Sequence, residues 1–311
     1  MTDASFIRYY ISEEMPNSLA WQIQNLLPQL SALHGWQWIP ANQFEYKGSF
    51  GYPPGPNYIP SPNDLEIECI MRRCSAIVEH HDPSVVVESS LLEVLPSPAT
   101  IIDDILMLCS IAKCMDMLAI AQEVLKPDGS RHISFRLAPQ LAAVQEVVPQ
   151  DDLGNFIKDS LAKLQQGDWK EDVGFIPAII WYAQAQRSFR AATFGLMLSL
   201  YWISLEILSR TYIQNRGLLG TIQNKKKRVK KFTNARGFTG ASWGFLDAAI
   251  DDWYAVRNAA FHEGNLPVWS EYKFEQRGHQ LAEFSSFVLA DMLQEQSPSQ
   301  KDLIAARLSS Y

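Results

Sequence analysis

The chain has 311 residues, of which 47% are apolar and 20% are charged. This composition is that of a globular protein and excludes a disordered chain, and the length favours two domains. The net charge of −7 is unevenly divided, since residues 1–150 hold 8 basic and 17 acidic residues (−9), whereas residues 151–311 hold 19 and 17 (+2).

Residues 1–148 are predicted to form a mixed α/β domain. Residues 1–14 carry four charged side chains and no long apolar run, so we expect no signal peptide. Apolar and β-branched runs predict extended pieces at 36–39 and 44–46 and strands at 64–78, 84–95 and 132–137. The same reading predicts helices at 18–32 and 100–125 and a Gly- and Pro-rich loop at 48–62.

Residues 149–296 are predicted to form an all-helical bundle. The expected helices span 152–166, 176–189, 191–215, 218–232, 242–263 and 271–295. Short connections between long helices favour antiparallel neighbours. Residues 297–311 are expected to be a tail with a loop and a short amphipathic helix. The predicted fold class is therefore α+β, a mixed α/β N-terminal region followed by an all-α helical bundle.

Two features bear on the compartment of the protein. Residues 191–209 are about as long and apolar as a membrane span, but Glu206 lies among them and no second such segment exists. We therefore predict a buried core helix, rather than a membrane helix, and no membrane association. The four cysteines form two C-x4-C pairs, too widely spaced for the usual zinc pairs, and no secretory signature accompanies them. We expect reduced thiols in a cytoplasmic protein.

The predicted helix over 242–263 carries polar residues among apolar ones. One stripe, with spacings of three or four residues, consists of Leu246, Ile250, Trp253, Arg257 and Phe261. The adjacent row consists of Tyr254, Asn258 and His262. Gly264 is expected to end the helix, which places His262 at the negative end of the helix dipole and favours its imidazolium form.

Arg257 and His262 together suit phosphodiester chemistry on RNA. A fixed guanidinium can neutralise a phosphate and the additional charge of its transition state. An imidazole that titrates near neutrality can exchange a proton with a ribose hydroxyl or a leaving oxygen. Because the neighbouring 2′-hydroxyl can be the nucleophile, this chemistry needs no metal and no cofactor, and we expect neither.

The segment Arg257-Asn258-Ala259-Ala260-Phe261-His262 resembles the motif of the HEPN family, in which an Arg, a polar residue and a short spacer precede a His. Its flanks resemble the Apea-like branch, with apolar and aromatic residues before the Arg, a Phe before the His and a Gly two residues after it. Residues 202–208 resemble the family's earlier core helix, whose acidic residue corresponds to Glu206. The resemblance covers roughly residues 150–295.

The resemblance implies a metal-independent endoribonuclease whose active site is shared across a homodimer, in a family rich in toxins and antiviral (anti-phage) defence effectors. It implies that Arg257 and His262 are catalytic and that Asn258 orients the His or the phosphate. Glu206 and Tyr254 would support them, and we hypothesise that Glu206 pairs with Arg257. One alternative is a non-catalytic module that binds RNA or protein. The other is a structural role, in which Arg257 makes a buried ion pair and His262 caps a helix.

A basic segment precedes the motif. It consists of Lys225, Lys226, Lys227, Arg228, Lys230 and Lys231. These side chains are predicted to contact RNA phosphates, and a solvated helix face is the alternative. The expected partners are RNA and a second copy of the chain, with a regulatory protein or phage component as a trigger. The acidic N-terminal domain is expected to sense that trigger, select the target or restrain the basic segment.

Overall fold

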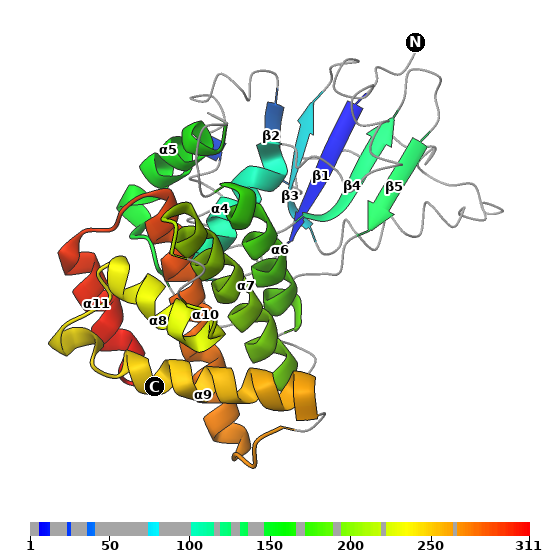
Figure 1. Cartoon of the computed structure of the whole chain (residues 1–311). Coiled ribbons are helices and arrows are strands. Elements are labelled where there is room, and N and C mark those ends of the chain that lie inside the picture. Colours follow the sequence, from blue (N-terminus) through cyan, green and yellow to red (C-terminus); the bar gives the residue numbers. More distant parts are fainter. Residues whose placement is uncertain are drawn as a thin grey trace, which may run out of the picture. The chain divides into compact units, whose positions relative to one another are not determined.

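The computed structural model describes residues 6–12, 24–25, 36–40, 74–80, 101–114, 119–125, 131–135, 146–165, 172–188, 194–218, 222–263 and 266–311 (Figure 1). The chain divides into two compact units. Unit 1 comprises residues 1–107 and 117–139, and unit 2 comprises residues 108–116 and 140–311. Unit 1 contains a β-sheet and unit 2 is helical where it is described, so the fold class is α+β, as predicted.

Unit 1 is built on a five-stranded antiparallel sheet. Its strands are β1 (Phe6–Ser12), β2 (Trp36–Pro40), β3 (Cys74–His80), β4 (Ala119–Leu125) and β5 (Arg131–Phe135), in the order β2-β3-β1-β4-β5. The central strand β1 is buried along Ile7, Tyr9, Tyr10 and Ile11. The strands expected at 36–39 and 132–137 are confirmed, and β3 confirms the end of the strand expected at 64–78.

Several expectations for the N-terminal part lie outside the described residues. They are the extended piece at 44–46, the loop at 48–62 and the strand at 84–95. Of the helix expected at 18–32, only Gln24 and Asn25 are described, and both are helical.

The long helix predicted at 100–125 is wrong. Helix α4 covers Ile101–Lys113, and residues Ala119–Leu125 form strand β4 instead. Cys114 has a φ of 49°, a left-handed conformation that ends the helix, and the N–H groups of Val147 and Val148 bond to the carbonyl of Ala112. The Ala, Gln and Glu residues of β4 favour a helix locally, but pairing with β1 and β5 on both sides outweighs that preference.

A charged row crosses the middle of this sheet. Arg8 in β1 lies directly opposite Glu79 in β3 and Glu123 in β4. Nε of Arg8 is 2.6 Å from the Glu79 carboxylate, and its Nη1 is 3.6 Å from that of Glu123. Glu123 is fully buried and also accepts a hydrogen bond from the Tyr10 hydroxyl. Burial raises the pKa of Glu123, although Tyr10 and Arg8 oppose that rise.

Replacing Glu123 with Gln is expected to flatten the pH dependence of stability. Because the folded-state pKa of Glu123 is raised above its ordinary value of 4.5, its contribution to stability is full below that value and declines as pH rises through the folded-state pKa. As pH rises above 4.5, the free energy of unfolding measured in urea titrations should therefore fall more for the wild type than for Glu123→Gln. Asp159→Asn, at an exposed site on the surface, is the control, and parallel wild-type and Glu123→Gln curves would refute the prediction.

Unit 2 is formed by helices. They are η5 (Gln150–Asp152), α5 (Leu153–Gln165), α6 (Asp172–Ser188), α7 (Phe194–Asn215), α8 (Lys225–Ala235), η7 (Ala241–Trp243), α9 (Leu246–Asn258), η8 (Ala259–Glu263), α10 (Glu271–Leu293) and α11 (Pro298–Leu308). The helices expected at 152–166, 176–189, 191–215 and 271–295 are confirmed, as is the short helix in the tail. Helix α8 begins later than the expected residue 218, because Asn224 caps it by accepting a hydrogen bond from the backbone N–H of Lys227 (3.0 Å).

Helix α7 is the hub of unit 2. It contacts α6, α8, α9 and α10 (Figure 1), and its Tyr201, Trp202 and Leu205 are fully buried. Helix α10 is buried continuously over residues 281–293, and its Phe284 stacks on Trp253 of α9 with ring centroids 5.5 Å apart. None of the described helices combines the length and apolarity that a membrane span requires.

Gly174 allows α6 and α7 to approach closely. A Cβ atom at this position would lie 1.9 Å from Oγ1 and 2.5 Å from Cβ of Thr211. We expect Gly174→Ala to lower the free energy of unfolding by about 1–3 kcal/mol, because the two helices must separate to admit the methyl group. The control is Gly154→Ala in α5, where no atom lies within 4 Å of the added Cβ. Urea unfolding of both variants checks this, and equal stabilities would contradict it.

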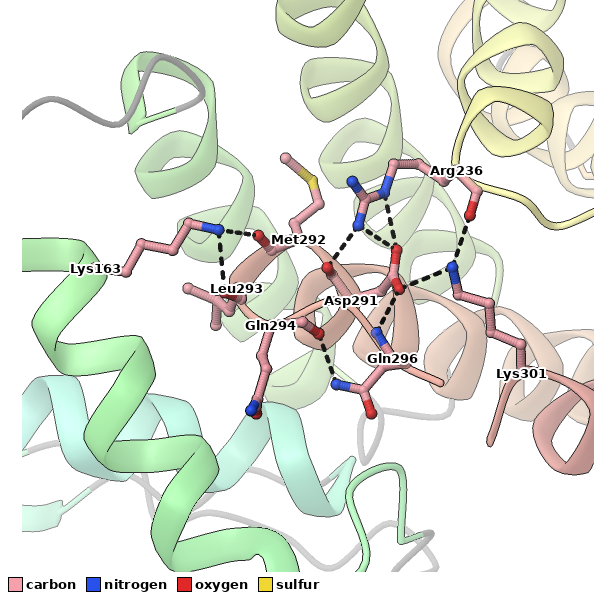
Figure 2. Close-up of polar contacts among 8 residues, drawn as sticks. All are labelled: Lys163, Arg236, Asp291, Met292, Leu293, Gln294, Gln296 and Lys301. Atoms are coloured by element: carbon pink, nitrogen blue, oxygen red, sulfur yellow. Dashed lines mark hydrogen bonds and ion pairs between the residues drawn. The ribbon is translucent and has the colours of Figure 1, made fainter. Parts of the chain in front are cut away.

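A buried carboxylate ties the ends of three helices together (Figure 2). The side chain of Asp291, near the end of α10, is fully buried, and its Oδ2 accepts hydrogen bonds from Arg236 Nε (2.8 Å) and Nη2 (2.5 Å). Its Oδ1 accepts from the backbone N–H of Gln296 (3.0 Å) and lies 3.2 Å from Nζ of Lys301 in α11. Lys163 of α5 adds hydrogen bonds to the carbonyls of Met292 and Leu293, at 2.8 and 3.1 Å. These contacts hold α5, α11 and the end of α8 to the C-terminal end of α10.

Candidate functional site

The site lies where α9 ends. After Asn258 the α-helix continues as one π-helical turn, η8, over Ala259–Glu263. Residues five apart in a regular α-helix are rotated by about 140° and point away from each other, whereas a π turn brings them together. Nη1 of Arg257 accordingly lies 2.7 Å from Nε2 of His262. The π turn therefore brings these two residues together into one site.

The Arg257–His262 contact joins a cation to a ring nitrogen. A guanidinium only donates hydrogen bonds, so Nε2 of His262 is the acceptor in this contact. The π turn thus brings a cation against the imidazole ring. Gly264, the expected end of the helix, lies outside the described residues.

The apolar stripe of α9 places Arg257 against the protein. Leu246, Ile250 and Trp253 are at most 3% exposed, and the Arg257 side chain is 11% exposed. The guanidinium donates to Oδ1 of Asn258 (3.2 Å). Its Nε is buried and has no hydrogen-bond partner among the described residues. A buried N–H without a partner is costly, so this N–H is an unsatisfied polar group within the described residues.

Glu206 in α7 links Arg257 to helix α8. Its Oε2 lies 4.0 Å from Nη2 of Arg257, the outer limit of an ion pair, which is the contact hypothesised from the sequence. Its Oε1 lies 2.9 Å from Nζ of Lys225, the first residue of α8. Tyr254 lies nearby, since its ring packs against Trp202 (centroids 5.4 Å apart) and Nζ of Lys226 is 5.8 Å from its centroid. The structure thus gathers one carboxylate, two cations and an imidazole at this end of α9.

The rest of the basic segment divides into three groups. Lys226 and Lys230 pair with Asp251 of α9 at 3.2 and 3.0 Å, and Lys230 also lies 3.4 Å from Asp247. The pKa of Asp251 is lowered. Desolvation alone would raise this pKa, but the hydrogen bonds and positive charges of the two lysines together outweigh desolvation. Arg228 is 9% exposed, so its side chain offers little surface to an RNA phosphate.

Lys227 and Lys231 form the third group. They are exposed, lie four residues apart on one face of α8, and pair with no carboxylate among the described residues. Because no described carboxylate neutralises them, the charges of these two side chains are available to a phosphate.

The sequence did not predict the surroundings of two residues of this site, Phe261 and Lys225. Phe261 belongs to the predicted core stripe, but the π turn rotates it out of the stripe and leaves it 51% exposed. The sequence predicts that Lys225 contacts RNA but does not predict its ion pair with Glu206. An Arg and a His separated by five residues, rather than four, is the signal that could have suggested a π turn.

Comparisons with known proteins found no relative of this chain. No family model, no curated protein and no solved structure matches the chain. Within the described part of the chain, no three His, Cys, Asp or Glu side chains cluster as metal ligands would. The protein is therefore characterised by its α+β fold and by the residues of the site themselves.

Proposed function

We propose that unit 2 is a metal-independent endoribonuclease of HEPN type, with Arg257 and His262 as its catalytic residues. The observation that carries this proposal is their 2.7 Å contact on a π turn, between a guanidinium with an unused buried N–H and an exposed imidazole. π turns occur frequently at functional sites.

In the proposed reaction the phosphate first draws Arg257 away from His262. A phosphate anion is a stronger acceptor than a neutral imidazole, so the guanidinium exchanges one for the other and Nε2 is freed. Nε2 then takes the proton of the ribose 2′-hydroxyl while the 2′-oxygen bonds to phosphorus. The bond from phosphorus to the 5′-oxygen breaks, and solvent protonates that oxygen. The products carry a 2′,3′-cyclic phosphate and a 5′-hydroxyl.

The other residues have positioning roles in this proposal. Glu206 holds Lys225 and lies at ion-pair distance from Arg257, so it keeps two cations beside the scissile phosphate. Asn258 accepts a hydrogen bond from Arg257 and orients it. Lys227 and Lys231 supply exposed charge for the flanking RNA backbone. The remaining proposals are a cytoplasmic location, a homodimer that shares the site, and a role as a toxin or anti-phage effector triggered through unit 1.

A non-catalytic module that binds RNA or protein is the second candidate. The observation that favours it is the same contact, because an imidazole whose Nε2 already accepts a hydrogen bond cannot act as a base until Arg257 moves. The two candidates make different predictions about what happens when RNA is added.

The test is to incubate full-length protein with end-labelled RNA in EDTA, comparing the wild type with Arg257→Ala and His262→Ala. Cleavage by the wild type alone, with cyclic-phosphate ends, is the result expected of the enzyme. Controls are Arg210→Ala, at an exposed site on α7, and His279→Ala on α10, which should cleave normally. A folded wild type that binds RNA without cleaving it would establish the binding module. Cleavage that survives both site variants would refute the assignment of the site.

A further inference from the structure

Phe261 is an aromatic ring presented to solvent inside the proposed site. It is 51% exposed and lies on the π turn, directly before His262. Cζ of Arg257 lies 5.5 Å from the centroid of its ring. A single exposed apolar side chain is ordinary on a protein surface. This one is different in its position, because a cation and a proton acceptor flank it.

A ring beside a phosphate-binding cation matches the layout of a nucleotide. Each nucleotide carries a phosphate and a flat base on one ribose, so a protein that holds both needs a cation and a stacking surface next to each other. Proteins that bind single strands combine these elements, with bases stacked on aromatic side chains and Arg or Lys on the backbone. Arg257 and Phe261 form such a pair, and His262 is adjacent to both.

We propose that Phe261 stacks on an unpaired base next to the scissile phosphate. This inference rests on the proposed function and names the residue of the site that contacts the base. In a duplex both faces of each base are covered by neighbouring bases, and the bases of an RNA helix are difficult for side chains to reach. Duplex RNA therefore cannot use the ring, whereas an unpaired base in a loop or a single strand can.

Four substitutions separate stacking from simple apolar contact. Phe261→Trp and Phe261→Tyr keep an aromatic ring, Phe261→Leu keeps apolar area without a ring, and Phe261→Ala removes both. Binding is measured by fluorescence anisotropy of labelled RNA in a His262→Ala background, so that cleavage does not interfere. Since Phe261 is half-exposed, all four variants should retain the unfolding temperature of their parent.

We expect Phe261→Ala and Phe261→Leu to weaken binding of a single-stranded oligonucleotide by about 5- to 100-fold, and the aromatic variants to bind within about 3-fold of the parent. Binding to a duplex of the same sequence should be unchanged in all four. An abasic nucleotide moved along the single strand should abolish the difference between the parent and Phe261→Ala at one position, because the base that the ring contacts is then missing.

Two results would overturn the inference. One is Phe261→Leu binding as tightly as the parent, which would make the residue an apolar contact, for example with another protein. The other is an effect of Phe261→Ala that no abasic position removes. Failure of the proposed function is a separate result, namely no cleavage by the wild type. The binding measurements decide the role of Phe261 in either case.

Discussion

Alanine in place of His262 is expected to lower the rate of RNA cleavage by about 10²- to 10⁴-fold, the usual contribution of a general acid or base. His262 is exposed on the π turn, so its removal should leave the unfolding temperature unchanged. Single-turnover cleavage of an end-labelled oligonucleotide in EDTA, combined with thermal unfolding, measures both quantities. The His279→Ala control should match the wild type in rate.

Replacing Arg257 with Lys tests the second catalytic residue. Arg257→Lys keeps the positive charge but loses the fork of donors that can contact phosphate oxygens in pairs. We expect a loss of about 10²- to 10³-fold, comparable to removing one preorganised donor to a transition state. If Arg257 were only the partner of Glu206, Lys would serve almost as well. Near-normal cleavage by Arg257→Lys would therefore contradict a transition-state role.

Alanine in place of Asp291 is expected to have the largest effect on stability, lowering the free energy of unfolding by about 3 kcal/mol or more. The carboxylate is fully buried, and its loss leaves Arg236 and Lys301, which are 22% and 11% exposed, without their shared anion (Figure 2). It also removes the acceptor for the backbone N–H of Gln296. Urea unfolding at neutral pH measures the loss.

A matched control is available in Asp251. This carboxylate also meets two cations, Lys226 and Lys230, but its side chain is 50% exposed. Because solvent screens such pairs, Asp251→Ala should cost less than about 1 kcal/mol. A similar loss in the two variants would show that burial does not govern the strength of the Asp291 network. Asp291→Asn, which retains an acceptor for Gln296, should fall between them.

Much of unit 2 could be predicted from its sequence. Hydrophobic periodicity located helices near those observed from α5 to α11, since each buries an apolar face whose spacing is visible in the chain. The same periodicity placed Arg257 in line with buried Ile250 and Trp253, where the structure has it. The start of α8 was misplaced because the Asn224 cap outweighs the apolar residues before it.

Other features depended on residues distant in the sequence. The segment 119–125 is a strand because β1 lies more than a hundred residues earlier and pairs with it, an interaction that local propensity does not report. Lys225 belongs with Glu206 because α7 and α8 pack together. Neither contact has a local signature.

For the candidate site, the amino-acid pattern was enough to select Arg257 and His262 and to put them on one helix, since side-chain type and helical period are local properties. A regular helix, however, would have pointed the two side chains apart and buried Phe261 with the stripe. The folded chain contains a π turn at this point, which brings His262 to Arg257 and turns Phe261 toward solvent. A π turn is unfavourable in isolation and depends on the packing around it, here against α7, so its position follows from tertiary contacts.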